Sequence, residues 1–273
     1  PAMSGFQREE SLGLFFRYQW TQIEDSPMTG FAAYDTHRFM DDYNMGISAY
    51  FTHDQTGPIM TNGVVGNYSY HLEIPSYGEN SHYFSGGISL GLYQHSLDGD
   101  KLIVNDLDDP LVIGDRKSAF IPEIGAGFLY YNEYVGFGFS VPQLLGFKAN
   151  FNGDLAKSTI QRNRHYYAMI HGKIPVGYAE ETFLFPSIWF RYAPHSPMNL
   201  DLRLKALIDE IFIIGLGYNT ANMVSGELGV NINHQYKISY SFTTQFTPWN
   251  TYTGDTHEIM FIYILDSEKH GYY

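Results

Sequence analysis

The segment Leu200–Ile208, Leu-Asp-Leu-Arg-Leu-Lys-Ala-Leu-Ile, places apolar residues at every even position and three charged residues at the odd positions between them. Successive side chains of a β-strand point to opposite faces, so this segment predicts a strand with one apolar and one charged face. The same alternation recurs in Leu12–Trp20, Val224–Ile232 and Tyr236–Thr243. The pattern predicts an all-β fold.

Strand segments follow one another along the whole chain, and helical signals are scarce. The segment Ala149–Ile160 allows one or two helical turns but lacks a stripe of helical period. Fourteen segments have strand character: 11–22, 28–38, 43–54, 59–74, 82–96, 119–132, 134–142, 165–176, 182–193, 198–208, 210–218, 222–232, 235–245 and 256–265.

The composition excludes several classes of protein. Aromatic residues make up 17% of the 273 residues and charged residues 16%, which is not the composition of a disordered chain. The net charge of −13 argues against a nucleic-acid binder, which needs a basic face. With no cysteine, the chain has no disulfide, thiolate ligand or catalytic thiol. The densest apolar stretch, Ile211–Tyr218, is far shorter than the roughly 18 residues of a membrane helix.

Two all-β architectures fit the alternation: a soluble sandwich or barrel, and a membrane barrel with its apolar face toward lipid. The even number of strands and their length favour the membrane barrel, whose tilted strands need about 9–11 residues. The connections also differ in length between the two ends. The three longest, Leu97–Ser118, Gln143–Arg164 and Phe246–Asp255, fall at one end, while short turns such as Asn132–Glu133 and Asp209–Glu210 fall at the other.

Long outer loops and short periplasmic turns are typical of outer-membrane proteins. We therefore predict a transmembrane antiparallel up-and-down β-barrel of about fourteen strands in a bacterial outer membrane. It forms a single domain over residues 1–273, with a short N-terminal segment 1–10 and a charged C-terminal tail 266–273. Aromatic residues near strand ends are candidates for the interfacial girdles: Trp20, Tyr50, Tyr70, Tyr134, Tyr192, Tyr218 and Trp249.

Charged residues on the polar faces of the strands are predicted to point into the lumen, because a charge facing lipid costs about 2–4 kcal/mol at the midplane. They would form a network of ion pairs that rigidifies a narrow or plugged lumen, or hold a partner segment inside the barrel; the two roles are compatible. The residues assigned to this network are Arg17, Arg191, Asp201, Arg203, Lys205, Glu227, Lys237 and Glu258.

A set of short motifs runs in order along the chain: Pro1–Gly5, Arg17–Trp20, Asp25–Pro27, Asp54–Pro58, Tyr68–Tyr70, Phe84–Gly91, Pro122–Tyr131, Tyr134–Gly136, Ser140–Leu145, Arg164–Tyr166, Pro186–Ser187 and Thr256–Met260. This ordered set resembles the PorP/SprF family of outer-membrane proteins, which belong to the type IX secretion system and gliding machinery. Pro1–Gly5 is similar to the family's "NPAYAG" segment, and Arg17–Trp20 with Asp25–Pro27 resembles "YRxQW…GAP". The chain departs from the pattern at its end, where residues 266–273 follow the expected terminal aromatic.

The resemblance implies a barrel that docks, and helps to export or retain, a cognate cell-surface protein such as a gliding adhesin, through that protein's C-terminal domain. It also implies periplasmic lipoprotein and ring components as partners, alongside outer-membrane lipid. The loops Leu97–Ser118 and Gln143–Arg164 are the candidates for outer contact. The alternative is a passive transporter or pore resembling the fourteen-stranded fatty-acid channels. The hypothesised contact residues are Asp106, Asp108, Asp109, Phe147 and Phe151.

Catalytic and metal-binding patterns are weak, and we expect no enzymatic activity and no cofactor. Gly87–Gly91 fits the G-x-S-x-G pattern around Ser89, but no helix follows to form a nucleophile elbow; a lumen-rim hydrolase is the third option. The loop Asp98–Pro110 is rich in the oxygen ligands that Ca²⁺ prefers but lacks EF-hand order, so a solvated acidic loop is the simpler interpretation. His165, His171 and His257 form no metal-ligand pair.

Overall fold

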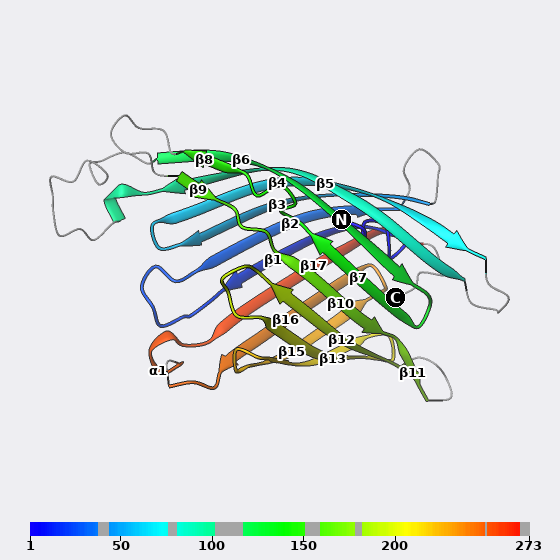
Figure 1. Ribbon diagram of the computed structural model, residues 1–273. Coiled ribbons are helices and arrows are strands. Elements are labelled where there is room, and N and C mark those ends of the chain that lie inside the picture. Colours follow the sequence, from blue (N-terminus) through cyan, green and yellow to red (C-terminus); the bar gives the residue numbers. More distant parts are fainter. Residues whose placement is uncertain are drawn as a thin grey trace.

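The structure is a computed structural model that describes residues 1–37, 44–75, 81–101, 117–150, 159–177, 182–248 and 250–267. Its strands form one closed antiparallel barrel (Figure 1). The strands of the first half are β1 (Glu9–Tyr18), β2 (Met28–Thr36), β3 (Met45–Thr56), β4 (Ile59–Ile74), β5 (His82–Leu97), β6 (Lys117–Tyr131) and β7 (Val135–Val141). Those of the second half are β10 (Tyr166–Gly172), β12 (Thr182–Tyr192), β13 (Asn199–Ile208), β14 (Phe212–Asn219), β15 (Met223–Ile232), β16 (Tyr236–Gln245) and β17 (Thr256–Ser267).

The ring closes where the first strand meets the last. β1 pairs with β17 from Glu9 opposite Ser267 to Tyr18 opposite His257, and β7 and β12 flank β10. Each of these fourteen strands is hydrogen-bonded to its sequence neighbour in the ring, which is the up-and-down order. The prediction of a fourteen-stranded antiparallel barrel is confirmed.

Three short strands add to the ring. β11 (Ile174–Val176) continues the line of β10 along β12 after a break at Lys173, whose N–H donates to the carbonyl of Tyr134 over 2.8 Å. β8 (Lys148–Asn150) and β9 (Thr159–Gln161) form a two-stranded ribbon between β7 and β10. Where the sequence allowed a helical turn, the described residues thus contribute a ribbon.

The two ends of the barrel differ in their connections. The 3₁₀ turn η1 (Gly99–Lys101), the β8–β9 ribbon and the helix α1 (Asn250–Thr253) all follow strands that end on one side, at the left of Figure 1. The turns at 132–134, 209–211 and 233–235 lie at the other end. We refer to these as the long-loop end and the short-turn end; in outer-membrane barrels the long loops are extracellular.

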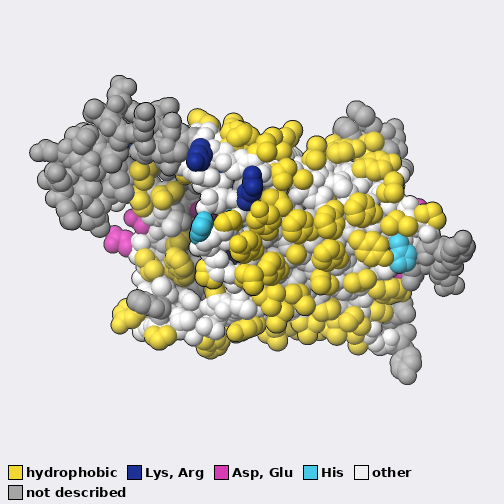
Figure 2. Space-filling view, viewed as in Figure 1, with side chains coloured by type: hydrophobic (Ala, Val, Ile, Leu, Met, Phe, Trp, Pro, Cys, Tyr) yellow, Lys and Arg dark blue, Asp and Glu magenta, His cyan; other side chains and the backbone are white. Residues whose placement is uncertain are grey.

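The outer wall of the barrel is apolar. Leu216 is 67% exposed and Leu228 64% exposed, and neither has a charged residue beside it on its own strand's outer face. Figure 2 shows apolar side chains covering the strands of the visible face, with few charged groups among them. Such a wall is what a membrane barrel presents to lipid. Within the described residues, no helix has both the length and the apolar character needed to span a bilayer.

The predicted aromatic girdle needs one correction. Trp20, Tyr70, Tyr134, Tyr192 and Tyr218 are exposed near strand ends, as expected. Tyr50 instead points into the barrel and stacks on Phe31, because it shares the inner face of β3 with Gly46 and Ser48. Trp249 lies outside the described residues.

The N-terminal segment, residues 1–8, lies inside the barrel. Three successive turns, from the N–H of Ser4 to the carbonyl of Pro1, Phe6 to Met3 and Arg8 to Gly5, coil it against the inner wall. Phe6 is 3% exposed and meets the ring of Tyr131 edge-on, with centroids 4.7 Å apart. The buried apolar cluster around it comprises Ala2, Phe6, Tyr83, Leu129, Tyr131 and Met169.

Candidate functional site

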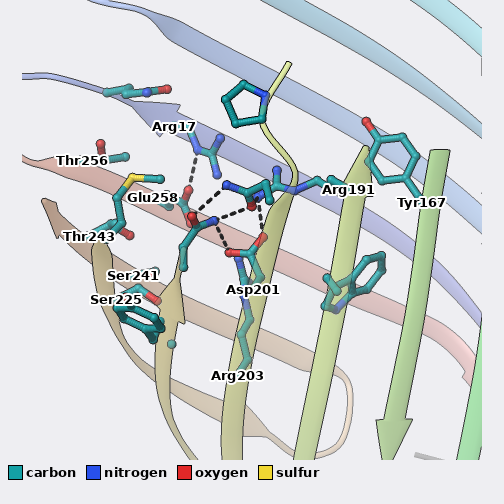
Figure 3. Close-up of a pocket in the computed structure, with 18 of the residues that line it drawn as sticks. Arg17, Tyr167, Arg191, Asp201, Arg203, Ser225, Ser241, Thr243, Thr256 and Glu258 are labelled. Atoms are coloured by element: carbon teal, nitrogen blue, oxygen red, sulfur yellow. Dashed lines mark hydrogen bonds and ion pairs between the residues drawn. The ribbon is translucent and has the colours of Figure 1, made fainter. Parts of the chain in front are cut away.

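A cavity of about 780 Å³ occupies the lumen toward the long-loop end (Figure 3). We call it the vestibule. Its wall is built from the inner faces of β1, β10 and β12 to β17, and its lining includes Gln19, Ser196 and Pro197 from the connections at that end. Five residues of the predicted lumen network line it: Arg17, Arg191, Asp201, Arg203 and Glu258.

Arg17 and Glu258 form an ion pair across the seam between the first and last strands (Figure 3). The two residues are direct partners in the β1–β17 register, so the pairing of the strands itself brings the charges together. The side chain of Glu258 is 15% exposed and that of Arg17 is 39% exposed. The pair therefore lies in the wall of the vestibule, with its cation more exposed than its carboxylate.

A second ion pair, Arg191 with Asp201, is joined to a pair of asparagines. The amide of Asn219 donates to Oδ1 of Asp201 over 2.6 Å and to Oδ1 of Asn199 over 2.8 Å, and Asn199 donates back to Asn219 over 2.8 Å. Arg191 also donates to Oδ1 of Asn199 over 3.0 Å. Charged groups and hydrogen-bonded amides thus fix three adjacent strands, β12, β13 and β14, at the vestibule wall.

Two further ion pairs lie on the inner wall. Nζ of Lys205 on β13 is 3.3 Å from Oε1 of Glu227 on β15, across the intervening β14. Gly215 is the partner of both residues in the register, and a Cβ there would come within 3.0 Å of Glu227, so the glycine leaves room for the pair. Nζ of Lys237 is 3.4 Å from Oε2 of Glu9, a residue that the predicted network did not include.

Arg203 differs from the other cations of the predicted network. Among the described residues it has no carboxylate partner, and it is exposed to the vestibule. Its side chain passes Gly217, where a Cβ would lie 3.5 Å from Cγ of Arg203 and 2.4 Å from Oγ of Ser225.

A further charged cluster was missed by the sequence reasoning. NH1 of Arg162 is 3.1 Å from Oε2 of Glu123, whose side chain is 3% exposed, and Gln143 donates to the same oxygen over 3.0 Å. The guanidinium of Arg162 also stacks over the ring of Tyr93, 3.7 Å from its centroid. Gln143 and Arg162 belong to the long connection after β7, and both reach the buried carboxylate on the inner face of β6. Glu123 has an odd number on β6, as do the buried Ile121 and Leu129, so it shares their inward face. This alternation was the sequence signal that could have identified it.

The N-terminal segment is held by hydrogen bonds to the inner faces of β2 to β5. The N–H of Gly5 donates to the carboxylate of Asp35 over 3.1 Å, and the hydroxyls of Ser69 and Ser85 donate to the carbonyls of Ser4 and Ala2 over 2.6 and 2.8 Å. Glycines make the approach possible. A Cβ at Gly46 would lie 2.0 Å from the Ser4 carbonyl oxygen, and one at Gly87 would lie 2.5 Å from the backbone nitrogen of Ala2.

The remaining predicted residues are placed as follows. Phe147 is half-buried, and its carbonyl accepts the N–H of Arg162 over 3.3 Å. Asp106, Asp108, Asp109 and Phe151 lie outside the described residues. Ser89 is buried in the middle of β5, within a continuous strand.

The described residues hold no cluster of three or more His, Asp or Glu side chains of the kind that could bind a metal ion. His165 approaches the oxygen of Gln143 (3.2 Å), His257 approaches the hydroxyl of Tyr240 (2.6 Å), and His171 meets the ring of Phe6. Each of the three histidines therefore contacts another side chain of the described residues.

The chain is similar to several solved structures at very low sequence identity. A FadL homologue of Pseudomonas aeruginosa is 9% identical, with 97% of this chain and 93% of that chain covered and a TM-score of 0.54. The KdgM porin is 7% identical over 93% of this chain and 98% of that chain (TM-score 0.41). A mutant porin of Rh. blastica is 7% identical, with 94% of this chain and 99% of that chain covered (TM-score 0.38). No curated protein sequence matches the chain.

The family model described as "Type IX secretion system membrane protein PorP/SprF" matches residues 1–263, nearly the whole chain. Its match agrees with the closed barrel, the apolar outer wall and the order of the sequence motifs. The chain therefore belongs to the PorP/SprF family, and it is an outer-membrane β-barrel of the type IX secretion system.

Proposed function

We propose that this barrel is a non-enzymatic docking protein that binds a cognate cell-surface protein, such as a gliding adhesin, and helps to export or retain it. The C-terminal domain of the cognate protein is the proposed point of contact. The observation that carries the proposal is the vestibule, a cavity of about 780 Å³ whose wall is fixed by ion pairs and which faces the long-loop end.

The vestibule is suited to a protein ligand because its wall is preorganised. The Arg17–Glu258 and Arg191–Asp201 pairs hold their side chains before any ligand arrives, so binding orders few groups. Trp189 and Tyr167 also line the cavity and offer aromatic area of the kind enriched at binding hot spots. The short turns at the other end of the barrel would face the periplasmic lipoprotein and ring components.

The N-terminal segment favours docking over the alternative of a passive pore. Residues 2, 4, 5 and 6 are buried against β2 to β6 inside the barrel, where a conducting lumen would need water. The likeness to the FadL homologue concerns the fold alone. Single-channel recording in planar bilayers separates the two functions: we expect no steady current from the intact chain, and a steady open pore would favour transport.

Copurification from native outer membranes tests docking. We expect a tagged chain to recover a large surface protein and a periplasmic lipoprotein, and Asp201→Arg to lose the surface protein because it places two like charges beside each other. Leu216→Ala, on the outer face of β14, is the matched control and should recover both. Recovery of the barrel alone from wild-type membranes would contradict the proposal.

A further inference from the structure

Two neighbouring rows of side chains cross β13, β14 and β15 on the inner wall. In the first row Lys205, Gly215 and Glu227 are register partners, and the lysine reaches over the glycine to the glutamate. In the second row Arg203, Gly217 and Ser225 occupy the equivalent positions, one step closer to the long-loop end. The second row therefore has the cation and the glycine of the first, but a serine in the place of the acid.

This missing acid leaves a positive site in an acidic protein. The vestibule lining holds three arginines, Arg17, Arg191 and Arg203, but only two carboxylates, Asp201 and Glu258, and each of these two is already paired with one of the other arginines. The whole chain carries a net charge of −13. Arg203 is thus the arginine of the lining whose charge has no partner among the described residues, and it faces the open cavity.

We propose that Arg203 binds a carboxylate of an extended peptide that enters the vestibule from the long-loop end. The proposal deepens the docking function and rests on it. A guanidinium offers a planar pair of N–H donors that matches both oxygens of a carboxylate. In a lumen with low-dielectric walls, an unpaired charge also attracts its counter-ion more strongly than it would on an open surface.

The surroundings of Arg203 suit the rest of a peptide. Hydroxyl groups on β15, β16 and β17 line the wall on one side of Arg203 and can donate to, or accept from, the backbone of an extended chain: Ser225, Ser241, Thr243 and Thr256 (Figure 3). Tyr167 and Trp189 line the other side and would pack against an apolar side chain next to the carboxylate. The carboxylate has two possible sources, a chain terminus or an Asp or Glu side chain.

Three N-terminally labelled peptides distinguish these sources in a fluorescence anisotropy assay with the purified barrel in detergent. The probes are Phe-Leu-Gly with a free terminal carboxylate, its terminal amide, and the amide of Phe-Glu-Gly. We expect the carboxylate-bearing probes to bind at least about tenfold more tightly than the uncharged amide, since a charge-assisted pair is worth a tenfold or larger change in affinity. Preference between the two acidic probes identifies the source. Equal binding of all three probes would overturn the proposal.

Variants of the same row locate the binding. We expect Arg203→Gln to weaken acidic-probe binding about tenfold and Arg203→Lys to retain part of it. Ser225→Glu should also weaken acidic-probe binding. The new carboxylate would form an ion pair with Arg203, as Glu227 does with Lys205 in the neighbouring row. Lys173→Gln, which removes a cation at the short-turn end that does not line the vestibule, is the control and should bind as wild type.

Heat-modifiable migration on gels confirms that each variant is folded, and Ser225→Glu keeps the test available if Arg203→Gln does not fold. Undiminished binding by folded Arg203→Gln or Ser225→Glu would overturn the proposal. Failure here is distinguishable from failure of docking, because copurification of a surface protein can persist when probe binding is independent of Arg203.

Discussion

Arg17 on β1 and Glu258 on β17 are register partners and form an ion pair at the seam where the first strand meets the last. The seam joins residues that lie 241 positions apart in the chain, so it forms only when the whole barrel closes. The charges face inward, beside the vestibule, while Phe16 and Ile259 face outward on either side of the same seam. The pair thus contributes both to closure and to the wall of the cavity.

Removing one charge from the seam should destabilise the barrel. We expect Glu258→Gln to lower the free energy of unfolding by roughly 1–2 kcal/mol, a value below that of a fully buried pair because Arg17 is partly exposed to the lumen. Urea titration of the barrel in lipid vesicles, followed by tryptophan fluorescence, measures this change. The exchanged pair Arg17→Glu with Glu258→Arg should recover part of the loss, and no loss in the single variant would contradict a role in closure.

The N-terminal segment should be displaced by a side chain at Gly46. A Cβ there would lie 2.0 Å from the carbonyl oxygen of Ser4, which leaves no space for both. We expect Gly46→Val to expose residues 1–8 to protease and to produce current in planar bilayers. The matched control is Gly66→Val on β4, where a Cβ has no atom within 4 Å and the chain should stay protected and silent. Equal protection of residues 1–8 in both variants would contradict the placement of the segment.

The amide of Asn219 should contribute to stability through its hydrogen bonds. Its side chain donates to Asp201 and Asn199 and accepts the N–H of Ala221 over 2.7 Å, while the residue is 5% exposed. We expect Asn219→Leu to lower the free energy of unfolding by about 1–3 kcal/mol, because buried polar partners lose their hydrogen bonds. Tyr218→Phe, on the outer face of the same strand, serves as control with a change within about 0.5 kcal/mol. Similar losses in the two variants would argue against the network.

Much of the barrel could be predicted from the chain because the period-two alternation is local. Leu202 and Arg203 are successive residues of one strand, so they must point to opposite faces, and the alternation alone assigns the leucine outward and the arginine inward. Contacts that depend on long-range folding could not be predicted in this way. Glu9 was placed before the first strand, yet β1 begins at that residue, and its carboxylate forms an ion pair with Lys237.

The long connections between strands were the second obstacle to predicting the site from the sequence. Arg162 lies in a connection with no alternation of its own, so its ion pair with Glu123 is a tertiary contact that the alternation does not predict. Tyr50 was assigned to a girdle because of its residue type, although its even position on β3 places it inside. Residue type therefore misled where parity would have been correct.

The assignment of faces is tested most directly by nitroxide spin labels at positions 202 and 203 of the barrel in lipid bilayers. Both wild-type side chains are exposed, so only the medium that each one meets tells lipid from water. We expect the label at Leu202 to be broadened by oxygen, which concentrates in the hydrocarbon, and the label at Arg203 by a water-soluble nickel reagent. Broadening of the label at 202 by nickel, with the label at 203 accessible only to oxygen, would contradict an apolar wall toward lipid and a charged vestibule inside.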